Sequence, residues 1–425
     1  MNSRNNFLTK ATPYRVFTAV LAAGALSFLI FAFINRSAAT FDWLIMQHTS
    51  DYSFADYFYH VFYGSDLSKT YNAYDVDPCF PPFSYLFYHY LYQIAPVDQM
   101  TSLREVQFFP YYMFIFVIGM AAAIVFFSYS IDLFMDQGRT DEECRKKRGQ
   151  NLLLTLLLLF SVPIGASAVE RANSAFIVLI LLIFAMAFKD SENKVLRELA
   201  LILIAVSANL KLYPAIFGLL YLKEKRWKEA LRLILYGVLL FIVPFFFMEG
   251  FKSIKEFLVI LYLMQGRSIE RMTTVRGVVT SLYMHFGGEE AKWTGHHVGI
   301  IVENIYLAVT LTGFFLSRNR WKSMFLLISP MVVYVSSAYR YTAAYFTIAL
   351  LFFLAENERD YSEKPGRKQV LNVIYALLFA GIFAIPIWGY GMELENIIYG
   401  FIYILLIVVT ADTFLSLRAA GPSYQ

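Results

Sequence analysis

Aspartates crowd into one aromatic-rich stretch near the start of the chain, residues 48–82, which holds five of them. The five are Asp51, Asp56, Asp66, Asp75 and Asp77, and a carboxylate can take the proton of a nearby hydroxyl group as a general base. A bilayer-spanning helix could not hold this many acids without partners, since each intramembrane charge costs roughly 2.5–3.5 kcal/mol. The stretch therefore predicts an acidic, aromatic platform at a membrane surface.

Three cations stand where apolar segments end or break: Arg171, Lys211 and Arg340. Arginine grips a phosphate group bidentately, whereas lysine acts as a point charge. Asn173 or Ser174 can cap the helix that follows Arg171, which leaves the positive end of that helix beside the guanidinium and predicts an anion site. The alternative for Arg171 is an interface residue whose side chain snorkels. Lys211 interrupts an otherwise apolar stretch, and such a lysine is by default a functional candidate.

Composition decides the class of protein that must position these residues. The chain has 425 residues, 58% of them hydrophobic and 16% charged, with a mean hydropathy of +0.52. One soluble core could not bury so much apolar surface, so we expect an all-α polytopic membrane protein with a single integral membrane domain, 1–425. The bilayer is the expected environment, and nothing in the sequence indicates nucleic acid as a partner.

The positions of the basic residues predict the topology. The apolar segment 16–34 follows a basic N-terminus and is expected to be a retained anchor that starts in the cytoplasm. A basic cluster at 139–148 follows the next long apolar segment, 107–134, so an even number of crossings separates the two. The short aromatic segment 80–96 must then lie along the outer surface, within a first outer loop spanning 37–106. Cys79 and Cys144 fall on opposite sides, which excludes a disulfide between them.

Segment 198–222 has basic residues at both ends although it is only about one helix long. A single crossing would place one basic cluster outside. Two half-helices that meet at residues 209–214 keep both clusters inside and put Lys211 at the outer face, and Pro214 favours this break. A second long outer loop with short amphipathic pieces follows at 249–299, and its part around His296 and His297 is expected to be a Gly-rich loop. In total we expect about twelve membrane helices, two of them half-length, with both termini in the cytoplasm and juxtamembrane helices on the outer face.

Several motifs occur in an order that resembles the polyprenyl-phosphate-dependent mannosyltransferases of glycosyltransferase family 87, in the GT-C superfamily. They are an aspartate after the first span, Lys69–Tyr71, Phe80–Phe83, Glu170–Asn173, Ala208–Pro214 with a basic stretch to Trp227, and a looser echo at Tyr339–Tyr341. The chain departs from the family pattern in two places. Phe80 stands where the family has tyrosine, and Ala172 stands where it usually has glycine.

The resemblance implies a GT-C-type helical bundle and a catalytic aspartate in the first outer loop. Its distance from Tyr71 favours Asp56, with Asp51 as the rival. Arg171, Asn173, Lys211 and Arg340 are then expected to hold the donor phosphate, and four residues to line the substrates: Tyr71, Pro82, Tyr213 and Tyr341. The reaction would move a mannose-like hexose from a polyprenyl-phosphate sugar to a glycan or glycolipid acceptor, with inversion, on the extracytoplasmic face of the plasma membrane.

No cofactor or metal is expected, because a donor with one phosphate needs no ion to bridge two phosphates. Asp75 and Asp77 form a DxD pair, which alone is weak grounds for a metal site. Two other classes stay open on the sequence alone: a membrane transporter, which would be expected to show internal repeats and midplane charges, and a non-catalytic polysaccharide-assembly protein.

Overall fold

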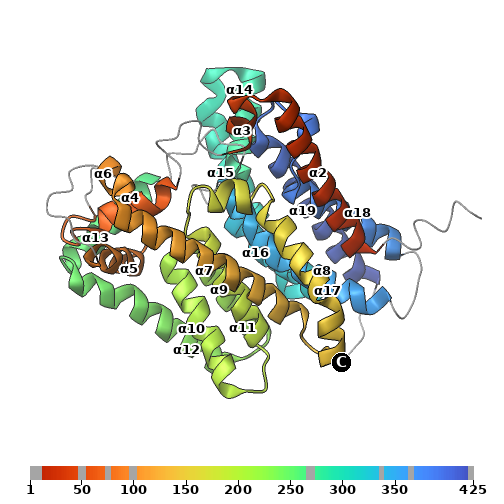
Figure 1. The fold of residues 1–425 in the computed structure, drawn as a ribbon, viewed down its shortest axis with the longest axis horizontal. Coiled ribbons are helices and arrows are strands. Elements are labelled where there is room, and N and C mark those ends of the chain that lie inside the picture. Colours follow the sequence, from red (N-terminus) through yellow and green to blue (C-terminus); the bar gives the residue numbers. More distant parts are fainter. Residues whose placement is uncertain are drawn as a thin grey trace, which may run out of the picture. The chain divides into compact units, whose positions relative to one another are not determined.

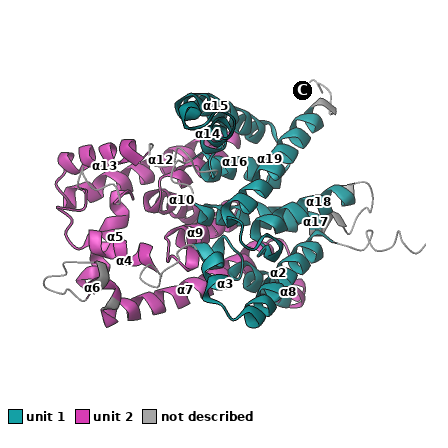
Figure 2. Cartoon of the chain, turned by 90° about the horizontal axis from the view of Figure 1, so that it is seen from above, with its two compact units in different colours: residues 1–46, 149–167, 269–425 teal, residues 47–148, 168–268 magenta. Residues whose placement is uncertain are grey.

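The structure is a computed structural model that describes residues 12–45, 54–71, 78–94, 103–264, 273–334, 339–361 and 368–419. Throughout these ranges the regular elements are helices, as predicted (Figure 1). Asp51, Asp75 and Asp77 lie outside the described residues. The chain divides into two compact units (Figure 2): a first unit, residues 1–46, 149–167 and 269–425, and a second unit, residues 47–148 and 168–268. Each unit is described by itself.

Among the described residues, five helical segments are long and apolar enough to cross a bilayer, so the chain is a multi-pass membrane protein. They are Pro13–Asn35, Pro110–Met135, Trp227–Phe247, Glu289–Leu316 and Leu394–Leu417. Two shorter apolar helices, Ala175–Phe188 and Gln369–Phe383, accompany them. The predicted total of about twelve membrane helices, like the predicted single domain, stays a prediction.

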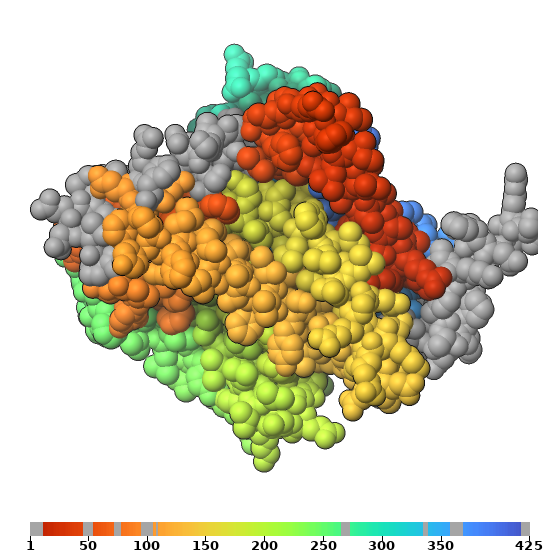
Figure 3. Space-filling view, viewed as in Figure 1, coloured from red at the N-terminus to blue at the C-terminus, as the bar shows by residue number. Residues whose placement is uncertain are grey.

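The long apolar helices leave large hydrophobic side chains uncovered. On the helix at Pro110–Met135 (α7), Phe114 is 64% exposed and Val125 is 66% exposed. Figure 3 shows this helix, in orange, running across the visible face of the second unit. Soluble proteins rarely expose apolar patches of this extent, whereas lipid tails would cover them. The exposed apolar surface therefore agrees with the bilayer environment that the composition predicts.

The second unit consists of short helices at one end and longer helices that lead away from it. Its elements are α4 (Ala55–Gly64), α5 (Pro82–Gln93), α6 (Leu103–Phe108), α7, α9 (Ala175–Phe188), α10 (Lys194–Leu210), η3 (Tyr213–Phe217), α11 (Gly218–Lys223), α12 (Trp227–Ile242), η4 (Val243–Phe247) and α13 (Phe251–Met264). Helix α5 has 12 residues and is about 18 Å long at 1.5 Å per residue, too short for a core of about 30 Å. This length suits the predicted surface helix.

The predicted break in segment 198–222 is present. Helix α10 ends at Leu210, and Lys211 has an extended backbone with φ −148° and ψ 135°. A short 3₁₀ helix, η3, then begins at Tyr213 with Pro214 in its first turn, where a missing N–H costs nothing. Ser84 of α5 donates to the carbonyl of Leu210 at 3.0 Å, which satisfies one of the acceptors that the helix end leaves open.

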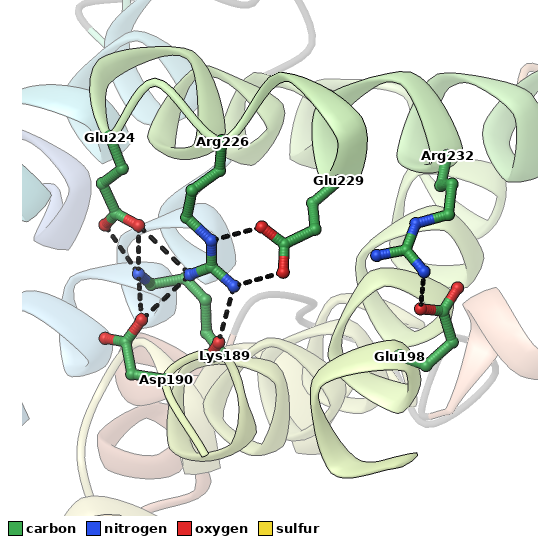
Figure 4. A network of polar contacts seen from close by, with 7 residues as sticks. All are labelled: Lys189, Asp190, Glu198, Glu224, Arg226, Glu229 and Arg232. Carbon is green, nitrogen blue, oxygen red and sulfur yellow. Dashed lines mark hydrogen bonds and ion pairs between the residues drawn. The ribbon is translucent and has the colours of Figure 1, made fainter. Parts of the chain in front are cut away.

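The chain returns after this break to the end where α10 began. Lys189, just before α10, donates to Glu224, just after α11, at 2.6 Å (Figure 4). Arg226 also donates to the carbonyl of Lys189 at 3.1 Å and to the carboxylate of Glu229 (Figure 4). In a single straight crossing, Lys189 and Glu224 would lie at opposite ends of the segment. The geometry is therefore that of a hairpin, with Lys211 at its tip.

The first unit has a core where three helices meet. Its elements are α2 (Pro13–Asn35), α3 (Ala38–Leu44), α14 (Val275–Gly287), η5 (Glu289–Ala291), α15 (Lys292–Leu316), α16 (Arg320–Val333), η6 (Arg340–Tyr345), α17 (Phe346–Tyr361), α18 (Lys368–Phe383), η7 (Ile387–Gly389) and α19 (Leu394–Ala419). Trp321 of α16 packs against Phe353 of α17 at 5.1 Å and Tyr375 of α18 at 4.8 Å between ring centroids. Helix α8 (Asp141–Leu159) and the π-helical turn η2 (Ile164–Val169) cross the division between the units.

The second predicted outer loop differs from expectation at its end. Helix α15 begins at Lys292, so its first two turns fall inside the range 249–299 that was predicted as a loop. Gly295 and Gly299 were interpreted as loop residues, so the start of this helix was not predicted. Both lie against α14: an added Cβ would stand 2.6 Å from Tyr283 Cβ at Gly295 and 2.9 Å from the Arg276 carbonyl oxygen at Gly299. These glycines permit close helix packing and do not mark a loop.

The hairpin predicts the accessibility of its tip and ends. In a protein whose Cys79 and Cys144 are replaced by serine, Leu212→Cys should react with a membrane-impermeant thiol reagent added outside. Lys194→Cys and Lys225→Cys, at the two ends, should react only after permeabilisation. Labelling of Lys194→Cys and Lys225→Cys from opposite sides would contradict the hairpin, and labelling of Leu212→Cys from the cytoplasmic side alone would reverse its direction.

Candidate active site

Asp56 lies in the first turn of α4 and is 9% exposed. Its carboxylate accepts hydrogen bonds from Arg171 on both oxygens, with the Nε–Oδ2 distance at 3.0 Å, and from the amide of Asn173. The guanidinium therefore binds the carboxylate bidentately, which is the strongest geometry for this pair. The structure brings together three of the residues that the sequence singled out.

Backbone contacts hold α4 against the turn Glu170–Asn173. The N–H of Phe54 donates to the carbonyl of Glu170 at 2.9 Å, and the N–H of Asp56 donates to that of Arg171 at 3.1 Å. These bonds satisfy donors that the start of a helix leaves open. The turn is tight, and Ala172 has φ 51°, the left-handed region that favours glycine. That conformation gives a physical reason for the glycine usual at this position in the family pattern.

Asn173 has a double role in this turn. Its side-chain oxygen accepts from the N–H of Ala175 at 2.9 Å, at the start of α9, while its amide nitrogen donates to Asp56. The predicted cap of the returning helix is present in this form. The same side chain thus caps α9 and orients the carboxylate.

Electrostatics keep Asp56 ionised. Burial by itself would raise the pKa of this carboxyl, but the hydrogen bonds and charge of Arg171 and the hydrogen bond from Asn173 outweigh it, and the pKa lies below its usual value. Asp56 is therefore a carboxylate at neutral pH, and it can accept a proton only from a strongly acidic partner or when Arg171 moves away.

Lys211 lies in the same unit at the tip of the hairpin and is 5% exposed. Its Nζ lies 4.3 Å from the centroid of the Phe80 ring and 5.9 Å from that of Tyr213, so the ammonium contacts aromatic faces. Burial lowers the pKa of Lys211 to about 8, although the charge of Asp56 opposes the shift. The lysine is thus mostly charged at neutral pH, and its charge is sensitive to mildly alkaline conditions.

Phe80 is the centre of an aromatic cluster between Lys211 and α4. Its ring stacks on the imidazole of His60, with centroids 3.9 Å apart, and its carbonyl accepts from the hydroxyl of Tyr71 at 2.6 Å. Pro82, also predicted to line the substrates, is buried at the start of α5. Tyr71 and Pro82 therefore help to hold the backbone at Phe80 in place.

Two predicted residues, Arg340 and Tyr341, belong to the first unit. Arg340 begins η6, is 2% exposed and places its Nε 3.8 Å from a carboxylate oxygen of Glu395. The site described above consists of second-unit residues alone, so the roles of Arg340 and Tyr341, like that of Asp51, stay predictions. Elsewhere in the first unit, a polar cavity of about 410 Å³ is lined by residues such as Lys322, Glu356 and Asp412 and includes none of the predicted site residues.

Sequence reasoning overlooked two members of the cluster, His60 and Phe80, as site residues. His60 follows Asp56 by four positions, so both lie on one face of α4, and this spacing was a usable signal once α4 was read as a helix. Within the described residues, no group of three or more His, Cys, Asp or Glu side chains is arranged to hold a metal ion.

A buried carboxylate bonded to arginine, beside a buried lysine and an aromatic cluster, on a multi-pass helical scaffold, is suited to proton transfer and to holding an anion. Comparison with known families agrees with this class. The profile of glycosyltransferase family 87 matches residues 80–337, more than half of the chain. The protein belongs to glycosyltransferase family 87 and is a membrane glycosyltransferase. No curated protein and no solved structure matches it.

The family match begins at residue 80. It therefore covers Arg171, Asn173, Lys211 and Tyr213, but neither Asp56 before it nor Arg340 after it. The connection of Asp56 to the matched region comes from the structure, through its bonds to Arg171 and Asn173.

The Asp56–Arg171 pair predicts a stability pattern. Arg171→Gln should lower the free energy of unfolding by about 3 kcal/mol, because it leaves a buried carboxylate without its cation. The double variant Asp56→Asn with Arg171→Gln should be less destabilised than Arg171→Gln alone, since no uncompensated charge remains. Thermal unfolding in detergent measures this cycle.

The pH dependence follows from the lowered pKa of Asp56. Stability from the pair is fully present above the unfolded-state pKa of about 3.8 and is lost as the pH falls through the lower folded-state value. The difference in melting temperature between wild type and Asp56→Asn should therefore be constant from pH 8 to about 5 and shrink below about 4.

In the cycle of variants, equal destabilisation of Arg171→Gln and the double variant would show that Asp56 and Arg171 do not act as a pair.

Proposed function

We propose that the protein transfers a hexose from a polyprenyl-phosphate sugar to a hydroxyl group of a glycan or glycolipid, on the extracytoplasmic face of the plasma membrane. The observation that carries the proposal is the buried Asp56 carboxylate, held by Arg171 and Asn173 in the same unit as the buried Lys211. Within a glycosyltransferase, this set supplies a base and cations without requiring a metal.

In the proposed reaction, the acceptor oxygen attacks the anomeric carbon from the side opposite the phosphate. The new bond joins that carbon to the acceptor oxygen. The bond from the carbon to the phosphate oxygen breaks, and its electron pair stays on the phosphate oxygen. The acceptor proton passes to Asp56. A single attack from the opposite side inverts the configuration at the anomeric carbon, and cations stabilise the negative charge that grows on the leaving phosphate.

The low pKa of Asp56 suits a late proton transfer. An alcohol is a much weaker acid than a carboxylic acid, so Asp56 gains the proton only as the new bond makes the acceptor oxygen positive. Arg171 keeps the carboxylate ionised and oriented until then, and Asn173 fixes its position from the other side. Lys211 supplies the cation for the phosphate, with Arg340 assigned the same role and Tyr213 and Tyr341 lining the substrates. Asp51 is the alternative base.

Substitution of the base tests the proposal. Asp56→Asn should lower turnover by roughly a hundredfold or more, the scale expected for loss of an acid–base group, while binding of the donor persists. Asp51→Asn should lower it less. The assay is transfer of labelled mannose from a polyprenyl-phosphate mannose by purified protein, with donor binding measured separately. Full activity of Asp56→Asn with an inactive Asp51→Asn would assign the base to Asp51.

The same assay decides whether a metal takes part. Activity should persist when a chelator removes divalent metal ions, because the donor carries one phosphate and side chains are proposed to bind it. Loss of activity in chelator, reproduced by Asp75→Asn, would replace this mechanism with a metal-dependent one.

Lys211 predicts an alkaline limb in the pH profile. Its pKa of about 8 means that kcat/KM for the donor should fall as the pH rises through that value, because the neutral amine no longer attracts the phosphate. Lys211→Met should have a lower kcat/KM at pH 7 and lack this limb, whereas Lys211→Arg should keep its charge to higher pH. An unchanged limb in Lys211→Met would assign it to another group.

A further inference from the structure

His60 is a buried histidine within one helical turn of Asp56, and it is 6% exposed. Its ring lies among aromatic neighbours, 3.9 Å from Phe80 and 5.4 Å from Tyr88 between centroids, with an interplanar angle of 29° to each. Stacking against two rings fixes the plane of the imidazole. The direction in which its two nitrogens point is therefore set by the protein before any substrate binds.

One nitrogen of this ring has a partner and the other does not. Nδ1 lies 3.3 Å from the hydroxyl of Tyr85, whereas Nε2 has no hydrogen-bonding partner among the residues that the structure describes. A histidine whose ring plane is fixed and whose first nitrogen is bonded to the protein can offer its second nitrogen to a ligand or to water. Nε2 is thus positioned for a group from outside the protein.

The protonation of the ring follows from its surroundings. Burial, together with the nearby charges of Lys211 and Arg171, lowers the pKa of His60 to about 3 in spite of Asp56, so the imidazole is neutral. The 3.3 Å contact between Nδ1 and the Tyr85 hydroxyl fits the tautomer in which the hydroxyl donates the hydrogen bond and Nδ1 accepts it. In a neutral imidazole the other nitrogen then bears the hydrogen, and Nε2–H is a donor.

We propose that His60 binds the hexose of the donor, with Nε2–H donating a hydrogen bond to one of its hydroxyl oxygens. The inference rests on the proposed function and extends it to the sugar itself. A neutral donor suits an uncharged hydroxyl, whereas Lys211, on the same Phe80 ring, suits the phosphate. The aromatic cluster of Phe80, Tyr85 and Tyr88 thus orients a specificity-determining side chain next to the base.

Two substitutions distinguish this role from a structural one. Glutamine places an amide nitrogen near the position of Nε2, and asparagine places one near Nδ1. If Nε2–H binds the sugar, His60→Gln should keep the affinity for polyprenyl-phosphate mannose within about twofold, and His60→Asn should lose about tenfold. If the ring only supports Tyr85, the order reverses, because asparagine retains the contact with its hydroxyl. Binding is measured without acceptor, and thermal unfolding verifies that each variant folds.

The lipid without its sugar shows which part of the donor is bound. Polyprenyl monophosphate should bind wild type, His60→Gln and His60→Asn equally, because it has no hexose. A tenfold loss for this ligand in His60→Asn would assign the contact to phosphate and overturn the proposal. Equal affinity of both variants for the complete donor would overturn it as well.

A second histidine provides the matched control. Nδ1–H of His89, in α5, donates to the carbonyl of Gly64 at 2.8 Å, and the side chain is part-buried. His89→Asn and His89→Gln should leave donor affinity unchanged. If wild type binds polyprenyl monophosphate but gains nothing from the sugar, only the His60 assignment fails. If wild type binds neither lipid, the proposed function fails and this inference with it.

Discussion

A carboxylate removed from water must find a cation, and the second unit is arranged around that requirement at Asp56. The bond to Arg171 joins α4 to a turn 115 positions later in the sequence. Because two backbone bonds and the Asn173 amide reinforce the same contact, the start of α4 and the start of α9 have one relative orientation. Removing the charge from either side would leave the other buried and uncompensated, which costs more than the pair contributes.

The broad fold follows from the sequence because membrane insertion imposes strong rules. Hydrophobic length predicts the helices at Pro13–Asn35 and Pro110–Met135 closely, and Pro214 with the flanking lysines predicts the hairpin. The start of α15 escaped prediction for a physical reason. Gly295 and Gly299 read as loop residues, but they are needed where α14 and α15 pack too closely for a side chain.

The residues of the site were easier to predict from the sequence than the contacts that these residues make with one another. Charge type and position singled out Arg171 and Lys211, and the family resemblance singled out Asp56. The sequence nevertheless assigned the arginine to a substrate phosphate and did not indicate that it binds the aspartate. Such a pairing depends on the docking of α4 onto the turn at Ala172, a tertiary contact that no local pattern encodes. The role of His60 depends likewise on Phe80 and Tyr85, which come from outside its helix.

The expected role of Arg171 at the phosphate and its observed bond to Asp56 are compatible when charge is followed through the proposed reaction. Before transfer, Asp56 neutralises one cation, and the second, on Lys211, matches the single negative charge of a sugar phosphodiester. Afterwards Asp56 carries the acceptor proton and is neutral, while the leaving lipid phosphate monoester approaches two negative charges, since its second pKa is near 6. The charge that leaves the carboxylate thus reappears on the phosphate, and Arg171 is released from one anion as the other forms. The two cations then balance a dianion, so an arginine that first holds the base would stabilise the departing phosphate when the proton has moved.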